Sequence, residues 1–273
     1  MAARDPHRFS NKLDDGARDR LLDRLESRAR DAVFSKLFDN YVARTGLARA
    51  SKILEVGCGT GAMLRRLARD HQFSGTTLGI DHCDEFIAAA RRLSEEEGFT
   101  NKLRFQVGDA HGLNFVAGEF DAVIAHTILS HVTEPTQVLQ EMARVLEVGG
   151  TLIVFDGDYA SLTYAFPDHG FGQRMDAALA HATYNNPRIM RDLPRLLATH
   201  GLKLVAAWGD AVVEIGSASY FRSLAETYAP YVKSSGLLSG KAVDVWLTEQ
   251  HQAMENGSFF AACNYYTFHI QRV

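Results

Sequence analysis

Three glycines at alternate positions, Gly57, Gly59 and Gly61, constrain this chain more than any other feature of its sequence. They directly follow a stretch that favours a β-strand, with Ile53, Leu54 and Val56 as its apolar residues. Apolar residues then recur at helical spacing, namely Met63, Leu64, Leu67 and Ala68. The pattern predicts a strand, a tight turn and a helix. Glycine lets the backbone turn sharply and approach a ligand, and such a loop lies at the sheet edge where α/β folds bind nucleotides.

Glu55 helps to decide which kind of nucleotide this loop binds. Dinucleotide loops have the spacing G-x-G-x-x-G and bring a helix N-terminus to a pyrophosphate, which a nearby carboxylate repels. Here the spacing is G-x-G-x-G, and Glu55 stands two residues before the first glycine. A carboxylate at this position suits a cationic ligand such as S-adenosylmethionine, with its ammonium and sulfonium groups. The pattern therefore disfavours a nicotinamide dehydrogenase; an ordinary buried strand with a glycine turn is the remaining alternative.

The glycine loop resembles the first motif of class I S-adenosylmethionine-dependent methyltransferases, and later motifs follow in order. Residues 77–80 form a second apolar run that ends in Asp81. The resemblance implies that Asp81 accepts hydrogen bonds from the ribose hydroxyls and that His82 lies against the adenine. Many members have an aliphatic residue in the place of His82. After a third alternating strand, the resemblance assigns the adenine edge to Asp109 and Ala110.

The resemblance covers about residues 50–158 with five sequential motifs, and it is strongest to ubiquinone, menaquinone and natural-product methyltransferases. It implies a doubly wound α/β fold with a seven-stranded, mostly parallel sheet. We expect the later strands at residues 120–126, 151–155, 202–215 and 259–273. One methyltransferase domain, residues 1–273, would then comprise a cofactor-binding core (50–158), an amino-terminal helical cap (14–47) and a helical lid (217–256) inserted before the last strand.

Two histidines follow the fourth predicted strand. His131 lies on the loop that similar O-methyltransferases direct at the methyl acceptor, and histidine is a base near neutral pH. Asp156 ends the fifth predicted strand, so the pair could act as base and orienting carboxylate. Alternatively, His131 caps the next helix and Asp156 tightens a turn. The backbone of His126 is expected near the methionine part of the cofactor, whereas His111 is expected to face solvent.

The amino-terminal segment is predicted to be disordered at residues 1 to about 12 and helical from 14 to about 45. Its apolar positions include Leu21, Leu25, Phe34, Phe38 and Tyr41. The arginines and aspartates between them are interpreted as a solvated face. The aromatic side chains suit packing against the core as well as ligand contact.

Composition narrows the function classes. The formal net charge of −4 argues against nucleic acid and anionic membranes as partners. The three cysteines, Cys58, Cys83 and Cys263, form no bridge framework, and no cysteine–histidine spacing predicts a metal site. No run of eighteen apolar residues and no signal-peptide pattern is present, so we expect a cytoplasmic protein without membrane insertion.

The predicted function is S-adenosylmethionine-dependent methylation of a small molecule in natural-product biosynthesis, with O-methylation of a hydroxyl by a histidine base favoured. Two alternatives stay open. One is C-methylation of a quinone, isoprenoid or other metabolite, and the other is a non-catalytic cofactor-binding regulatory subunit. The aromatic insertion suits either a lid over the acceptor or a homodimer interface.

Overall fold

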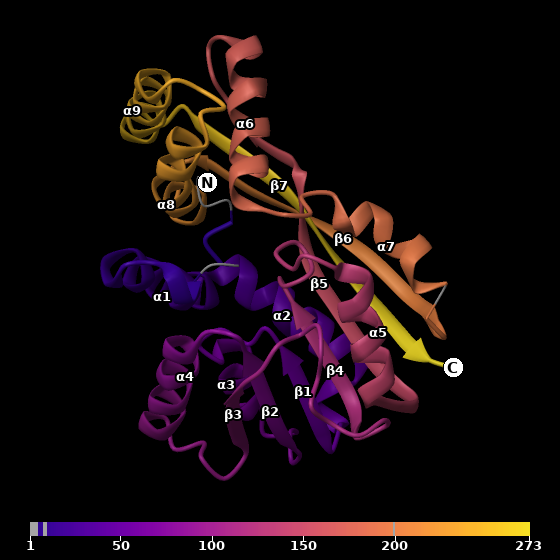
Figure 1. Ribbon diagram of the computed structural model, residues 1–273. Helices are drawn as coiled ribbons and strands as arrows, with labels where there is room; N and C mark the ends of the chain where they lie inside the picture. The colour runs from indigo at the N-terminus through magenta and orange to yellow at the C-terminus, as the bar shows by residue number, and fades with distance from the viewer. Residues whose placement is uncertain (1–4, 8–9, 199) are drawn as a thin grey trace.

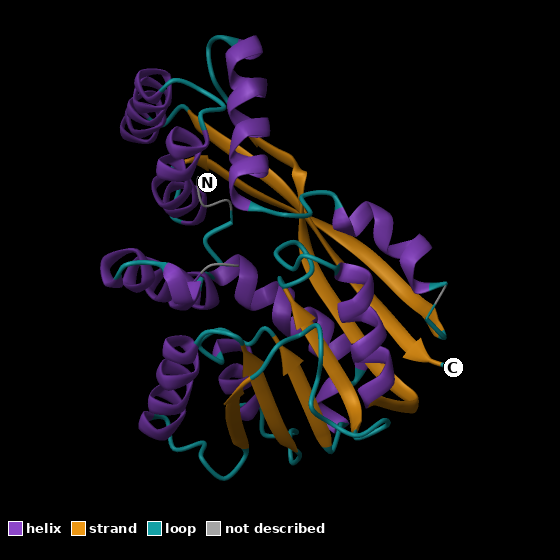
Figure 2. Ribbon diagram, in the orientation of Figure 1, coloured by secondary structure: helices purple, strands orange, loops and turns teal. Residues whose placement is uncertain are grey.

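The computed structural model describes residues 5–7, 10–198 and 200–273. Over these residues seven strands form one sheet in the order β3-β2-β1-β4-β5-β7-β6 (Figure 2). The strands are β1 (Lys52–Val56), β2 (Thr76–Asp81), β3 (Leu103–Val107), β4 (Phe120–His126), β5 (Leu146–Tyr164), β6 (Leu202–Gly216) and β7 (Phe259–Arg272). Neighbours from β3 to β5 pair in parallel, and β7 runs antiparallel to both β5 and β6. The predicted doubly wound sheet is confirmed.

Helices follow most strands. In the described residues they are α1 (Asp15–Arg30), α2 (Ala32–Thr45), α3 (Ala62–Ala68), α4 (Asp84–Glu96), α5 (Pro135–Val145), α6 (His169–Thr183), α7 (Ile189–Leu197), α8 (Tyr220–Ser235) and α9 (Gly240–Asn256), with short 3-10 turns η1 (Ser10–Lys12) and η2 (Leu47–Arg49). The core has two apolar layers, one on each face of the sheet. Ile53 packs with one layer and Leu54 with the other, which explains why two consecutive residues of β1 are apolar.

Strand β5 is longer than the sequence predicts. It was expected to end at Phe155, but it continues through Asp156 to Tyr164. The extension pairs with β7, which supplies the backbone hydrogen bonds that a turn would otherwise leave to solvent. The carboxylates that suggested a turn have partners of their own, because Asp158 forms an ion pair with Arg191 at 2.7 Å. The preceding helix α5 ends at Val145.

The amino-terminal helix α1 lies beyond the carboxyl ends of the parallel strands, above α3 and α4 in Figure 1. Asp14 accepts a hydrogen bond from the Ala17 N–H at the start of α1. Asp31 separates the two helices, since it ends α1 and its carboxylate caps α2. The expectation of disorder is wrong for the described part of residues 1–12: Asp5 is fully buried and Ser10–Lys12 forms η1. Residues 1–4 and 8–9 lie outside the described residues.

The segment between β6 and β7 forms α8 and α9, as the helical patterns predict. These helices surround the upper part of the long antiparallel strands together with α6 (Figure 1). Phe221 on α8 and Trp246 on α9 are fully buried, and Tyr220 hydrogen-bonds to Tyr265 of β7. The segment is therefore packed into the body of the molecule and not attached to it by a hinge.

Candidate active site

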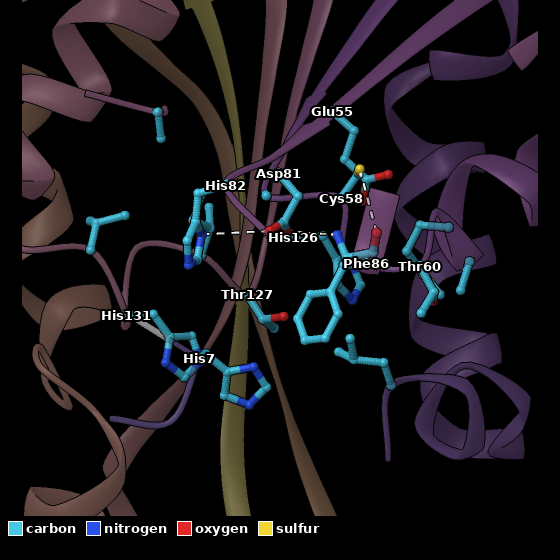
Figure 3. Close-up of a pocket in the computed structure, with 18 of the residues that line it drawn as sticks. His7, Glu55, Cys58, Thr60, Asp81, His82, Phe86, His126, Thr127 and His131 are labelled. Carbon is cyan, nitrogen blue, oxygen red and sulfur yellow. Dashed lines mark hydrogen bonds and ion pairs between the residues drawn. The ribbon is translucent and has the colours of Figure 1, made fainter. Parts of the chain in front are cut away.

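A cavity of about 440 Å³ lies between the carboxyl edge of the parallel strands and the helices above it. The glycine loop and the residues after β2, β3 and β4 line its lower side. Arg24 and Arg28 of α1, Tyr220 and Tyr228 of α8, and the amino-terminal His7 line the other side. Figure 3 shows His7 and His131 together, at a distance from Glu55 and Cys58 in this view (Figure 3). The volume is in the range of small-molecule sites.

The glycine loop needs glycine for conformation and for space. Gly57, Gly59 and Gly61 all have φ between 52° and 72°, a region that disfavours side chains. A Cβ on Gly57 would lie 2.5 Å from the Ile128 side chain, and one on Gly61 would lie 2.4 Å from Phe105. The N–H groups of Gly57 and Cys58 both donate to the Ile80 carbonyl at 2.8 Å. The loop is therefore closed tightly against β2 and faces the cavity.

Glu55 is buried at the floor of this cavity. Its side chain is 2% exposed, and its Oε2 has no hydrogen-bond partner among the described residues. Burial raises the pKa of Glu55 well above its ordinary value, and the charge of Asp81 adds to the effect. An unpaired buried carboxyl oxygen is costly, so it marks a place where a ligand donor would be stabilised. This observation fits the ammonium group of S-adenosylmethionine.

Asp81 holds the loop as well as facing the cavity. Its Oδ2 accepts a hydrogen bond from the Gly59 N–H at 2.9 Å, and its Oδ1 accepts one from the Cys83 N–H at 3.0 Å. Each carboxylate oxygen can accept a second bond, which leaves capacity for two hydroxyls. His82 lies at the rim, where its Nε2 is 3.1 Å from the Ser10 hydroxyl. The side chain of His82 is 44% exposed, so one face is open to a ligand.

Asp109 and Ala110 line the same cavity after β3. The Asp109 carboxylate accepts hydrogen bonds from the His111 backbone at 2.9 Å and from its ring at 2.7 Å. Although partial burial opposes the change, these bonds lower the pKa of Asp109. His111 was expected to face solvent, but it is half-buried and also contacts Thr133 at 3.0 Å. It thus connects the loop after β3 to the loop after β4.

His131 and Asp156 both lie at the site, but they do not form the expected pair. Asp156 is fully buried and accepts hydrogen bonds from the Ser130 N–H at 3.0 Å and the Ser130 hydroxyl at 3.1 Å. His131 instead has its Nδ1 at 3.0 Å from both oxygens of Asp5. Asp156 acts on His131 only through charge. The sequence missed Asp5 because no local pattern connects two residues 126 positions apart.

The electrostatic surroundings differ among three of the histidines that line the cavity, namely His7, His126 and His131. Although burial opposes the change, Asp5 raises the pKa of His131, with a further contribution from Asp156. Burial lowers the pKa of His7 well below its usual value, and the charge of His131, whose ring lies 4.6 Å away, adds to this. Burial also lowers the pKa of His126, whose Nδ1 is 3.0 Å from the Tyr41 hydroxyl. His131 is thus the histidine whose protonated form is stabilised.

Two arginines of α1 face the cavity, and the expectation of a solvated arginine face is wrong for them. Arg24 is 7% exposed and donates to the Tyr228 hydroxyl at 3.2 Å. Arg28 donates to the Thr127 hydroxyl at 3.1 Å. Both stand on the apolar stripe of α1, three and seven residues after Leu21, and this spacing is the signal that could have identified them. Thr127 itself has a φ of 55°, an unusual conformation for a β-branched residue.

Comparisons with known proteins agree with this geometry. Residues 54–154 match the model of a family described as "Methyltransferase domain". This segment is a methyltransferase domain. It contains the glycine loop, Asp81, Asp109 and the strands that place them, so the resemblance seen in the sequence is confirmed. The match and the methyltransferases among the relatives support an enzyme of this class.

Two curated relatives are matched over part of their length. The chain is 31% identical over 238 residues to an uncharacterized 37.1 kDa protein in transposon TN4556 of Streptomyces fradiae, covering 85% of this chain and 64% of that one. It is 37% identical over 127 residues to a phosphatidylethanolamine N-methyltransferase of Cereibacter sphaeroides, covering 45% of this chain and 61% of that one. This chain thus spans less than two thirds of either relative.

A solved structure confirms the fold around the methyltransferase domain. The crystal structure of the [4+2]-cyclase SpnF aligns with a TM-score of 0.58 and 22% identity, covering 89% of this chain and 84% of that one. At this identity the likeness concerns the fold alone. Among the described residues, no helix is long and apolar enough to cross a bilayer. The same residues contain no cluster of three or more histidine, cysteine or acidic side chains arranged for a metal ion.

Proposed function

We propose that this protein is an S-adenosylmethionine-dependent methyltransferase that methylates a hydroxyl group of a small molecule. The observation that carries the proposal is the buried, unpartnered Oε2 of Glu55 beside a glycine loop with no room for side chains. Such a site suits a ligand that combines a cationic end with close backbone approach. The methyltransferase domain at residues 54–154 supports the same assignment.

Each residue around the glycine loop can be assigned to one part of the cofactor. Glu55 would accept from the ammonium group, and Gly57, Gly59 and Gly61 would allow the methionine part to lie against the backbone. Asp81 would accept from the ribose hydroxyls, with Asp109, Ala110 and His82 at the adenine and the His126 backbone near the methionine part. When bound, the cofactor supplies an electrophilic methyl group on a sulfonium.

The reaction on the protein side needs alignment, exclusion of water and removal of one proton. His131 is the base in our proposal, and its Nε2 receives the hydroxyl proton because Nδ1 is engaged by Asp5. The Asp5 carboxylate orients the imidazole and stabilises the imidazolium that forms. Asp5 thus takes the orienting role that the sequence assigned to Asp156. A positioned base of this kind contributes roughly 10²–10⁴-fold to a rate.

The helices above the cavity would exclude water. We propose that residues 217–256 and the amino-terminal cap (14–47) form the cover of the acceptor pocket within one domain. Tyr220 and Tyr228 of α8 line the cavity, as does Phe34 of α2. A dry aromatic enclosure strengthens the electrostatic interactions inside it. A cytoplasmic location, the absence of nucleic-acid partners and a homodimer stay predictions from the sequence.

Two measurements test the function. Isothermal titration with S-adenosylmethionine should show binding of one equivalent, because the chain has one such loop. Release of S-adenosylhomocysteine across a panel of hydroxylated metabolites should then identify the acceptor, and product NMR should locate the new methyl group on oxygen. Binding without turnover on any acceptor would favour the regulatory alternative, and a methyl group on carbon would favour the C-methylation alternative.

A further inference from the structure

Unlike the buried Arg65, neither the buried Arg24 nor the partly buried Arg28 has a carboxylate partner among the described residues. Arg65 is 4% exposed and pairs with both Glu26 and Glu97 at 2.5 Å. Among the described residues, Arg24 and Arg28 hydrogen-bond only to hydroxyl oxygens. The residues outside the described ranges include no aspartate or glutamate. A buried arginine without an anion is costly, so the contrast requires an explanation.

The two guanidinium groups also lie on one face of α1. They are four residues apart, which places them one helical turn from each other on the cavity side. Like charges at this spacing repel. The protein therefore keeps two repelling cations at one side of its cavity. An arrangement that destabilises the free protein in this way suits a ligand of opposite charge.

Aromatic rings cover the faces of both guanidiniums and leave their edges for hydrogen bonding. The Arg24 guanidinium lies 5.0 Å from the Tyr228 ring centroid and 5.2 Å from that of Tyr220. The Arg28 guanidinium lies 4.6 Å from the ring centroid of Phe34. The Nε and Nη2 atoms of Arg28 are buried and have no hydrogen-bond partner within the described part of the chain. Guanidinium N–H groups lie in the plane of the group, in the fork geometry that matches carboxylate and phosphate oxygens.

We propose that Arg24 and Arg28 bind an anionic group, a carboxylate or a phosphate, of the methyl acceptor. The acceptor is then a small acid whose apolar or aromatic body lies against the tyrosines of α8. This inference rests on the proposed function, because it takes the arginine side of the cavity as the acceptor side. Glu55 and the glycine loop, on the opposite side, serve the cofactor.

The test uses an acid and an amide that share one skeleton and differ in charge, together with a phosphate as a second kind of anion. Wild-type protein saturated with S-adenosylhomocysteine is titrated calorimetrically with 4-hydroxyphenylpropionate, with 4-hydroxyphenylpropionamide and with phenyl phosphate. We expect the anions to bind about tenfold to a hundredfold more tightly than the amide, the range of one or two charge-assisted hydrogen bonds. The acid and the phosphate arms show which anion the arginine pair prefers. Equal or undetectable binding of acid and amide would overturn the proposal.

Variants then show which residues cause the preference for the acid over the amide. Arg24→Gln and Arg28→Gln should abolish it, whereas Arg30→Gln, on the same helix but 76% exposed, should retain it. In the absence of ligand, we also expect Arg24→Gln and Arg28→Gln to unfold at or above the wild-type temperature, because each removes the repulsion between the two guanidinium groups. A purely structural role for the arginines predicts the reverse. Arg24→Lys and Arg28→Lys keep the charge and serve if the glutamine variants do not fold.

The cofactor has a carboxylate of its own, so its affinity is measured in the same variants. A loss of S-adenosylhomocysteine affinity with an unchanged acid-over-amide preference would assign the arginines to the cofactor and overturn the acceptor proposal. Absence of S-adenosylhomocysteine binding to the wild type would instead contradict the proposed function. The two failures are thereby separated.

Discussion

The Asp5 carboxylate contacts the His131 imidazole, with both of its oxygens 3.0 Å from Nδ1. Asp5 comes from the amino-terminal segment and is fully buried, and its N–H donates to the Ala182 carbonyl of α6 at 3.1 Å. Asp5 is thus fixed between α6 and the loop after β4. In the proposed mechanism this contact sets the orientation and the pKa of the base.

The first prediction concerns the pH dependence of turnover. Since Asp5 raises the pKa of His131 above 6.5, the base form is lost as pH falls through this raised value, and turnover falls with it. Asp5→Asn removes the charge and should move this acidic limb to lower pH. His131→Ala should lower turnover roughly a hundredfold or more. Initial rates at saturating cofactor between pH 5 and 9 measure both effects.

His169→Ala is the matched control for the histidine substitution, because His169 begins α6 and does not line the cavity. Turnover of His131→Ala within a few-fold of wild type would show that His131 is structural. If the acidic limb of the pH–rate profile stays in place in Asp5→Asn, Asp5 does not set the pKa of the catalytic base.

The second prediction concerns cofactor affinity. Asp81→Ala removes both the expected ribose contacts and the bonds that hold the Gly59 and Cys83 N–H groups. Charge-assisted hydrogen bonds contribute about 1.5–3 kcal/mol, so S-adenosylmethionine affinity should fall at least tenfold. Isothermal titration gives the affinity, and circular dichroism checks folding. Asp23→Ala, exposed on α1, should bind as wild type. An unchanged affinity in a folded Asp81→Ala protein would remove Asp81 from the binding site.

The third prediction tests whether residues 217–256 cover the acceptor pocket or form a homodimer interface. Because α8 and α9 bury Phe221 and Trp246, replacing the whole segment would expose core, so a point change is sharper. Tyr228 accepts from Arg24 and contacts His7 at 2.8 Å inside the cavity. Tyr228→Ala should raise the acceptor KM several-fold with cofactor affinity unchanged. Tyr231→Ala, on the same helix but not lining the cavity, is the control. An altered mass by light scattering with intact turnover would identify an interface instead.

The fourth prediction concerns stability. Burial raises the pKa of Asp176 to about 7, although the Tyr164 N–H donates to its carboxylate. An unfolded aspartate ionises near pH 4, so the folded protein binds more protons between these values and its free energy of unfolding falls as pH rises through the window. Asp176→Asn should therefore stabilise the protein at pH 8 and change little at pH 4.

Urea unfolding at the two pH values measures this difference, and each unit of pKa displacement corresponds to about 1.4 kcal/mol. Asp192→Asn, on the exposed face of α7, is the control. A stability change of Asp176→Asn that is equal at both pH values would show that the carboxyl of Asp176 is not displaced.

The sequence alone determined the architecture and the cofactor side of the candidate site. Strand β4 runs from Phe120 to His126 as predicted, and the glycine loop lies between β1 and α3. These features are readable because they are local. A buried strand needs consecutive apolar residues, and a tight turn needs glycine, whatever the rest of the chain does.

Only the tertiary structure decided the acceptor side. The pairing of β5 with β7 carried the strand past Asp156, and the same folding brought Asp5, instead of Asp156, to His131. The helical spacing places Arg24 and Arg28 on the apolar face of α1, but only the packing of α8 and α2 shows which aromatic rings lie against them. Contacts between distant segments depend on how whole elements pack. A local pattern contains no information on that packing, because the same helix face is exposed or buried according to what lies against it.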